Sequence, residues 1–210
     1  MISKKLYNSA RISAIMNNIV RYCTTPSLIK ESVSDHAFLI SLLVIETSTD
    51  YPELFKYVDR ENLLIRATLH DMAESITGDI PAPVKRSIPE GESLFNEIEI
   101  KVSNKLCEGR PETFKDLLLM SIRFDNNDVI EEVLFKSLDY FCVLLKTSNE
   151  LYLGNNYYRR VLREMHDVIY NVRKSIEERV DTKEGYKELL TFYDNEVIEL
   201  LLKLEGLYKC

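Results

Sequence analysis

The stretch Leu69–Pro83, LHDMAESITGDIPAP, contains a histidine and three carboxylates, groups that can bind a metal ion or carry a proton. It places His70, Asp71 and Glu74 within five residues, and the apolar residues just upstream recur at helical spacing. At about 100° per residue, a helix through this stretch would direct the histidine and both carboxylates toward one buried side. Burying such charge is costly unless a metal ion or another partner compensates it. The stretch therefore predicts a reactive site on a helix that faces the protein interior.

The composition of the 210-residue chain predicts one domain, residues 1–210, with an all-α fold. The chain has only six glycines and few alternating β-branched residues, so helices are favoured over strands. A net charge of −7 does not suggest a surface for nucleic-acid polymers. There is no signal-peptide or membrane-spanning pattern, and the four cysteines lack a metal-binding spacing. These features predict a cytoplasmic protein without a membrane partner.

Apolar spacing and capping residues predict a series of helices joined by short turns. Ser32 or Ser34 is expected to cap the second helix, Asp59 the third, and Asn127 or Asp128 a long later one. The predicted helices cover residues 4–22, a second helix through Thr47, 59–75, 91–108, 111–124, a long helix to 149, 157–180 and 183–204. Three prolines between residues 79 and 89 predict a loop there.

A His-Asp pair on a helix, with His36 far before it and Asp139 far after it, resembles the HD superfamily of metal-dependent phosphohydrolases. The longer string, which continues from the pair through Glu74 to Thr77-Gly78-Asp79-Ile80-Pro81-Ala82-Pro83-Val84-Lys85, is similar more narrowly to the bacterial 5′-deoxynucleotidase branch. The similarity spans roughly residues 11 to 160, and the last 50 residues are expected to complete a single HD-domain helical bundle. The resemblance also implies a homo-oligomer, because members of the family are commonly homodimers.

The resemblance implies a metal site made by His36, His70, Asp71 and Asp139. Taken singly, His36 on its apolar stripe can be explained as an ordinary hydrogen-bonded core histidine. Asp139 lies in an almost wholly apolar run in mid-helix, where helix capping is not available to it. Two imidazoles and two carboxylates suit one divalent ion of Mn, Co, Fe, Ni or Zn, whereas Mg prefers a set of oxygen ligands.

The positions of the histidines favour a single metal ion. Binuclear HD phosphodiesterases use additional histidines between the His-Asp pair and the final aspartate, and none lies between Asp71 and Asp139 here. The spacing therefore argues against a cyclic-dinucleotide phosphodiesterase. His166 has polar neighbours and is expected to be a surface or packing residue.

A second group of residues is expected to bind the substrate. His36 closes the string Glu31-Ser32-Val33-Ser34-Asp35-His36, which is similar to the family's E-x-V-S-E-H. Fifteen residues earlier stands Arg21, at the spacing of a family arginine that holds the phosphate with paired hydrogen bonds. Tyr22 follows where the family has a tryptophan that reads the sugar. Because tyrosine is smaller and carries a hydroxyl, selectivity between deoxyribose and ribose stays open.

The resemblance extends to proton transfer and to charge near the phosphate. Glu74 is expected to carry a proton in catalysis, with an orienting role as the alternative. Asp79 is a candidate for acid work or substrate contact, with the capping of a loop as the alternative. Thr77 and Lys85 lie in the same matching string and are further candidates for substrate binding.

These features together predict a metal-dependent hydrolase that releases inorganic phosphate from the 5′ position of a (deoxy)nucleoside monophosphate by direct attack of water. No side chain is paired with a base in the manner of a covalent nucleophile. Two alternatives remain at this point. One is an HD enzyme that removes triphosphate or successive phosphates from a dNTP. The other is a catalytically silent protein that binds nucleotides for regulation.

Overall fold

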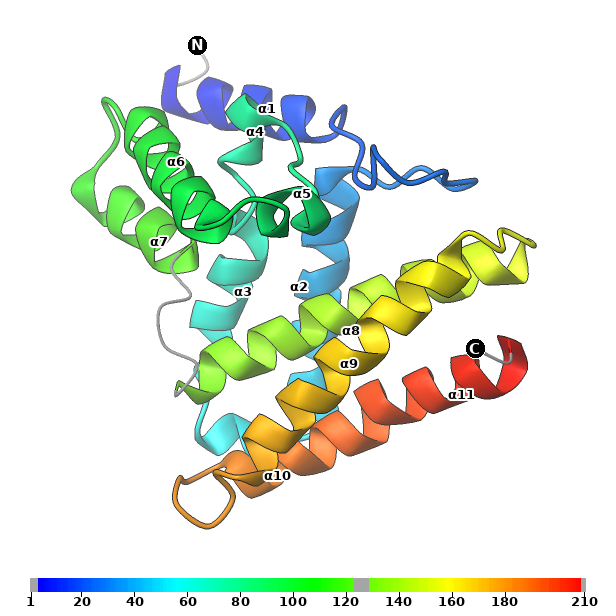
Figure 1. Ribbon diagram of the computed structural model, residues 1–210. Coiled ribbons are helices and arrows are strands. Elements are labelled where there is room, and N and C mark those ends of the chain that lie inside the picture. Colours follow the sequence, from blue (N-terminus) through cyan, green and yellow to red (C-terminus); the bar gives the residue numbers. More distant parts are fainter. Residues whose placement is uncertain (1–3, 123–128, 209–210) are drawn as a thin grey trace. The chain divides into compact units, whose positions relative to one another are not determined.

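The protein is described by a computed structural model that covers residues 4–122 and 129–208 (Figure 1). In these residues the chain forms helices and turns and no strand, which confirms the all-α prediction. An isolated antiparallel bridge joins Val20 to Ser32. The backbone contacts divide the chain into two compact units, and each is described by itself. One domain over residues 1–210 therefore stays a prediction.

The first unit is drawn from Met1–Pro26, Lys30–Ser41 and Leu64–Phe124. It contains α1 (Lys4–Met16), the beginning of α2 (Val33–Asp50), the end of α3 (Arg60–Leu69), α4 (Glu74–Thr77), α5 (Ala82–Arg86), α6 (Gly91–Leu106) and α7 (Glu112–Ile122). Helix α6 packs against α7 and α5, and α1 packs against α4. Apolar side chains from α1, α3, α6 and α7 surround a buried core of Met72, Cys107, Leu118 and Ile122. All the predicted site residues except Asp139 belong to this unit.

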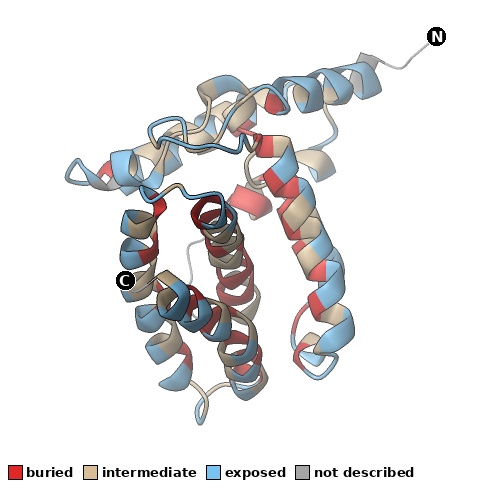
Figure 2. Ribbon diagram, turned by 90° about the vertical axis from the view of Figure 1, so that its right-hand side faces the viewer, coloured by how far each residue is buried: buried red, intermediate tan, exposed pale blue. Residues whose placement is uncertain are grey.

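The second unit is drawn from Ser27–Ile29, Leu42–Leu63 and Asp125–Cys210. It contains the remainder of α2 and α3, a 3₁₀ turn (Leu54–Lys56), α8 (Ile130–Tyr152), α9 (Tyr158–Glu177), α10 (Tyr186–Phe192), a π-helical segment (Tyr193–Ile198) and α11 (Glu199–Tyr208). Helices α9, α10 and α11 pack against α8. Buried residues follow one side of these helices and exposed residues the other (Figure 2). Cys142 is buried on α8.

The short segment Ser27–Ile29 is anchored to α8 and α9 by polar contacts. The buried Glu150 carboxylate accepts hydrogen bonds from the N–H groups of Leu28 and Ile29, both at 2.9 Å. The Lys146 ammonium pairs with Glu150 at 2.7 Å and also donates to the Ile29 carbonyl. The carboxylate is thus satisfied by one cation and two backbone donors, which is how a buried charge becomes tolerable.

Several helix boundaries differ from those predicted. Helix α1 ends at Met16 instead of residue 22, because the chain beyond it pairs with a distant segment: the Val33 N–H donates to the Ile19 carbonyl at 3.0 Å. The predicted loop at 79–89 contains helix α5, since Pro81 and Pro83 occupy its N-cap and first turn, where a missing N–H costs nothing.

Near the C-terminal part, α8 continues to Tyr152, past the predicted residue 149, and the predicted helix 183–204 begins only at Tyr186. Gly185 precedes it in the left-handed conformation, with φ of 77°. The predicted caps Asn127 and Asp128 lie outside the described residues. Asp59 does cap α3, accepting from the N–H groups of Glu61 and Asn62. None of the described helices is long and apolar enough to cross a membrane.

Candidate functional site

The His-Asp pair lies in a tight turn and not on a helix, so the predicted helix 59–75 is wrong in this part. Helix α3 stops at Leu69, and α4 begins at Glu74. The His70 ring explains the break, because its Nδ1 lies 3.1 Å from the Ala67 carbonyl, which the Asp71 N–H would otherwise bind in a continuing helix. The following amides bond three residues back, as from Met72 to Leu69 and from Glu74 to Asp71.

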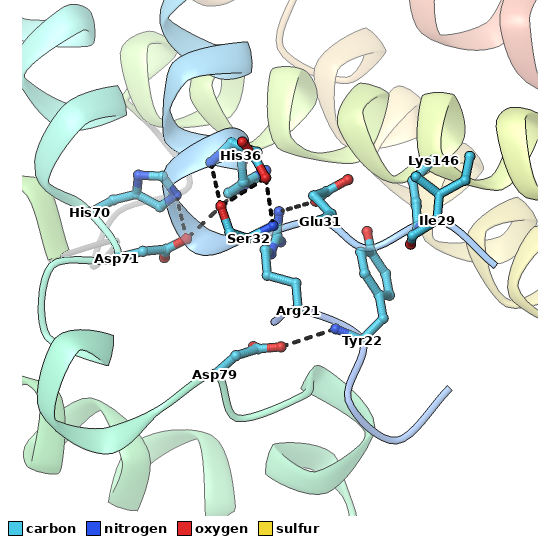
Figure 3. Close-up of polar contacts among 11 residues, drawn as sticks. Arg21, Tyr22, Ile29, Glu31, Ser32, His36, His70, Asp71, Asp79 and Lys146 are labelled. Atoms are coloured by element: carbon cyan, nitrogen blue, oxygen red, sulfur yellow. Dashed lines mark hydrogen bonds and ion pairs between the residues drawn. The ribbon is translucent and has the colours of Figure 1, made fainter. Parts of the chain in front are cut away.

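This turn brings three of the four predicted metal ligands together. Candidate ligand atoms of His36, His70 and Asp71 all lie within 4.8 Å of one another. Asp71 Oδ2 is 3.0 Å from His70 Nε2 and 3.8 Å from His36 Nε2, and the two ring centroids are 5.4 Å apart (Figure 3). The grouping needs no regular helix, because the turn places Asp71 beside the imidazole that precedes it.

The donor chemistry of the three residues fits a divalent metal ion. His70 Nδ1 faces the Arg66 and Ala67 carbonyls at 3.2 and 3.1 Å, and since a carbonyl can only accept, this nitrogen carries the proton. Its Nε2 is then the nitrogen that would bind a metal ion, and the backbone contacts of Nδ1 hold the ring in place. Burial alone would raise the pKa of Asp71, but the neighbouring imidazoles and Arg21 hold it well below its ordinary value. Asp71 is therefore a carboxylate.

His36 is fixed at the first turn of α2 by a capping box. The Ser32 hydroxyl accepts from the Asp35 N–H at 3.1 Å, and Asp35 Oδ2 accepts from the Ser32 N–H at 2.9 Å. This reciprocal pair makes Ser32 the N-cap, with Asp35 in the place of the usual glutamate. His36 itself is 1% exposed, and Val33 and Ile40 on the same helix are buried as well.

Arg21 lies in a turn after α1, although the predicted helix over residues 4–22 included it. One of its terminal nitrogens, Nη1, donates to Glu31 Oε1 at 3.0 Å, and its backbone N–H donates to the Glu31 carbonyl at 2.9 Å. The positive charge of the guanidinium acts to lower the pKa of Asp71, and it opposes the increase that burial causes in the pKa values of Glu74 and Asp79. The sequence places Glu31 within a motif but indicates no role for it.

Tyr22 adopts an unusual backbone conformation next to Asp79. Its φ is 59°, a left-handed value that residues with a side chain seldom adopt. The Tyr22 N–H donates to Asp79 Oδ2 at 3.2 Å, which ties this conformation to the segment after α4. Burial raises the pKa of Asp79, while Arg21 opposes the increase. The Asp79 side chain therefore contacts the backbone of Tyr22, the residue that is predicted to read the sugar.

Glu74 opens α4 and has an environment unlike that of the other acids. Its Oε2 is buried and has no hydrogen-bond partner among the described residues. Burial, reinforced by the charges of Asp71 and Asp79, raises the pKa of Glu74 to about 10, against the opposing pull of Arg21 and Lys85. Before any cation binds, this side chain is a neutral carboxylic acid at pH 7.

Thr77 and Lys85, the further candidates for substrate binding, lie at the end of α4 and on α5. The Thr77 hydroxyl donates to the Gly78 carbonyl at 2.9 Å, at the end of α4. Lys85 is on α5 and pairs with Glu99 of α6 at 2.8 Å. Burial alone would lower the pKa of Lys85, but the Glu99 carboxylate raises it, so the side chain stays charged.

Asp139, the predicted fourth metal ligand, is partly buried in the middle of α8, in the second unit. Its part in the metal site stays a prediction.

Known proteins with similar sequences share one description. A sequence model of the YfbR-like 5′-deoxynucleotidase family matches residues 10–183. The 5′-deoxynucleotidase of Vibrio cholerae is 27% identical over 165 residues, which cover 78% of this chain and 84% of that protein. The 5′-deoxynucleotidase YfbR of Shigella boydii is 29% identical over 139 residues, covering 66% and 70%.

Two solved structures with a similar fold are described as HD phosphohydrolases. An HD-domain phosphohydrolase from Listeria innocua superposes with a TM-score of 0.69 at 19% identity, covering 94% of this chain and 99% of that one. The cyanophage S-2L HD phosphohydrolase DatZ, solved with dA and one catalytic Zn²⁺ ion, gives a TM-score of 0.56 at 16% identity, covering 95% and 98%. With the matching family model and the His36, His70 and Asp71 cluster in place, the chain belongs to the YfbR-like 5′-deoxynucleotidase family.

Proposed function

We propose that this protein hydrolyses the 5′-phosphate of a (deoxy)nucleoside monophosphate, giving a nucleoside and inorganic phosphate. The observation that carries the proposal is the cluster of His36, His70 and Asp71, accompanied in the same unit by an arginine and a buried acid. Family membership supports the same activity, since the relatives from Vibrio cholerae and Shigella boydii are named 5′-deoxynucleotidases.

His36, His70 and Asp71 would hold one divalent metal ion, with Asp139 proposed as the fourth ligand. Two imidazoles and two carboxylates favour Co, Mn, Fe, Ni or Zn over Mg. When bound, such an ion lowers the pKa of a water molecule and polarises a phosphoryl oxygen. The bond from His70 Nδ1 to the backbone keeps Nε2 directed at the site without any further adjustment.

Arg21 would hold the phosphate of the substrate. Its planar guanidinium can donate two parallel hydrogen bonds to phosphoryl oxygens, and its charge stabilises the anionic group that is transferred to water. Lys85 and Thr77 are proposed as additional contacts. Lys85 can add positive charge in this role while it remains paired with Glu99.

Glu74 is the proposed proton carrier. In its neutral form it can give a proton to the leaving 5′-oxygen, and in its ionised form it can accept one from the attacking water. A cation held by the three ligands would oppose the charges of Asp71 and Asp79, and would therefore lower the pKa of Glu74 toward the range in which both forms are populated. Asp79 is proposed as a second acid or a contact for the sugar.

The proposal is tested by measuring phosphate release from dNMPs, NMPs and dNTPs with metal-stripped protein given Mn, Co, Zn or Mg in turn. Release of one phosphate from a dNMP with a transition metal is the expected result. Triphosphate as the product would replace the proposal by a dNTP triphosphohydrolase. Nucleotide binding with no release from any substrate would indicate a silent regulatory protein.

Tyr22 is proposed to contact the sugar. Tyr22→Trp should raise the ratio of dNMP to NMP turnover several-fold, because the larger ring fills the space that a ribose 2′-hydroxyl would need. The ratio of kcat/KM for dAMP and AMP measures this effect. If the substitution leaves that ratio unchanged, the sugar is read elsewhere.

We also propose that the protein is a homodimer located in the cytoplasm. Size-exclusion chromatography with light scattering would test the oligomeric state, and cell fractionation would test the location.

A further inference from the structure

Arg21 is held by Glu31 at two points. The backbone N–H of Arg21 donates to the Glu31 carbonyl at 2.9 Å, and its Nη1 donates to Glu31 Oε1 at 3.0 Å (Figure 3). Both side chains are only 16% exposed, so the pair is largely shielded from water. The bridge between Val20 and Ser32 lies directly beside it. Arg21 is thus fastened, through backbone and side chain, to the residues that begin α2.

We propose that Glu31 is a positioning residue, which holds the Arg21 guanidinium where it binds the substrate phosphate. The inference rests on the proposed function, since it takes Arg21 to be the phosphate-binding residue. A guanidinium is planar and carries its five N–H donors in a rigid fork. The bond to Glu31 therefore restricts the orientations that the whole group can adopt.

The need for such an anchor follows from the other acids of the site. The positive charge of Arg21 interacts favourably with the ionised forms of Asp71, Glu74 and Asp79. Without Glu31, those of the three acids that are ionised would compete for the flexible arginine and draw it away from the phosphate. An arginine that is already anchored also loses less rotamer freedom when the substrate binds.

The same short segment positions a metal ligand. Glu31 immediately precedes Ser32, the N-cap of α2, and the capping box of Ser32 and Asp35 fixes the turn that carries His36. Residues 31–36 therefore set the position of the phosphate-binding arginine relative to one metal ligand. This gives a physical role to the glutamate of the Glu31-Ser32-Val33-Ser34-Asp35-His36 string.

The test compares Glu31→Ala, Glu31→Gln, Arg21→Ala and the double variant Arg21→Ala/Glu31→Ala. Glu112→Ala is the matched control, because Glu112 is an exposed glutamate paired with a nearby lysine, Lys115. For each metal-loaded protein we would measure the binding of inorganic phosphate by calorimetry, kcat and KM for dAMP, metal content and thermal unfolding. Phosphate binding gives a readout that does not depend on turnover.

Glu31→Ala should weaken phosphate binding and raise KM by about 10-fold to 100-fold, the effect of losing one charge-assisted hydrogen bond, with metal content and unfolding temperature unchanged. Glu31→Gln keeps an acceptor for Arg21 and should fall between the wild type and the alanine variant. Because Glu31 acts through Arg21, Glu31→Ala should have no further effect in the Arg21→Ala background.

Three outcomes would overturn the inference: unchanged phosphate binding in Glu31→Ala, tighter binding, or a loss that adds to that of Arg21→Ala. A wild type that binds no phosphate would reject it as well. If the wild type binds phosphate but hydrolyses no nucleotide, the proposed function fails, and phosphate binding by the variants still decides the role of Glu31. Should Glu31→Ala not fold, Glu31→Gln carries the same comparison.

Discussion

Asp71 and Glu74 are three residues apart, and their environments push their pKa values in opposite directions. The imidazoles and Arg21 keep Asp71 ionised, whereas burial raises the pKa of Glu74 to about 10. Two carboxylates with separated pKa values can take separate roles, one as a permanent anion and the other as an acid or a base. This contrast supports the proposal that Asp71 binds the metal ion and Glu74 transfers the proton.

Glu74→Gln should reduce kcat by about 10² to 10⁴-fold, the contribution of a positioned acid or base, while metal content stays at the wild-type level. Glutamine has the shape of the neutral acid, so the folded structure should tolerate it. Steady-state kinetics with dAMP and elemental analysis measure the two quantities, and the exposed Glu112→Gln serves as the control. Activity near that of the wild type would show that Glu74 only orients a neighbouring group.

Asp139→Asn should weaken metal binding by at least about 100-fold, the upper end of the loss caused by residues that merely orient a ligand. An amide keeps the size of the side chain but removes the negative charge that binds a cation. Metal titration followed by calorimetry measures the affinity, and Asp167→Asn, a position on α9 outside the proposed site, is the matched control. An affinity equal to that of the control would exclude Asp139 as a ligand.

At the scale of the helix, the capping box at the start of α2 predicts that Ser32 stabilises the fold more than Ser34 does. Ser32→Ala should lower the free energy of unfolding by about 1 kcal/mol, because the Asp35 N–H loses its acceptor. Ser34→Ala should change it by much less, since the Ser34 hydroxyl makes only a 3.4 Å contact with the Ser13 carbonyl. Urea denaturation of both variants measures the difference. Equal losses would show that the box does not stabilise α2.

Periodic apolar residues make the longer helices predictable from the sequence. Helices α6 and α9 lie within a few residues of their predicted limits, and Asp59 caps α3 as expected. Local patterns could not show where α1 ends, because its boundary depends on pairing between residues 19–21 and 31–33. The sequence likewise gives no sign that the His70 ring would take a helix carbonyl and end α3.

The residues of the site are more predictable than their geometry. The resemblance to the HD family predicts His36, His70 and Asp71 as metal ligands, and the structure brings candidate ligand atoms of these three residues together. The contacts of Arg21 with Glu31 and of Tyr22 with Asp79 could not be predicted, because each depends on how distant turns meet. The left-handed backbone of Tyr22 has no sequence signal, as no glycine or asparagine stands there.

At the scale of the whole molecule, the chain passes repeatedly between its two units. Ser27–Ile29 belongs to the second unit, although the residues on both sides of it belong to the first. Glu150 and Lys146 hold this segment through its backbone. A buried ion pair of this kind is costly to break, because removing one partner leaves the other charge without compensation. Glu150 is therefore expected to affect the stability of the entire chain.

Glu150→Gln should lower the free energy of unfolding by an amount that depends on pH. Burial alone would raise the pKa of Glu150, but Lys146, Asn155 and the backbone donors of Leu28 and Ile29 lower it from 4.5 to about 2. The ionised carboxylate therefore stabilises the folded state above pH 4.5, by roughly 3 kcal/mol, and this contribution falls by about 1.4 kcal/mol per pH unit as the pH decreases toward 2. Urea denaturation between pH 7 and pH 3 should thus show a difference between wild type and variant that is constant above about pH 5 and shrinks below it. Glu164→Gln, at an exposed i,i+4 pair with Arg160, should show almost no difference at any pH. A difference for Glu150→Gln that did not change with pH would mean that the side chain stabilises the fold by packing and hydrogen bonding, and not by its charge.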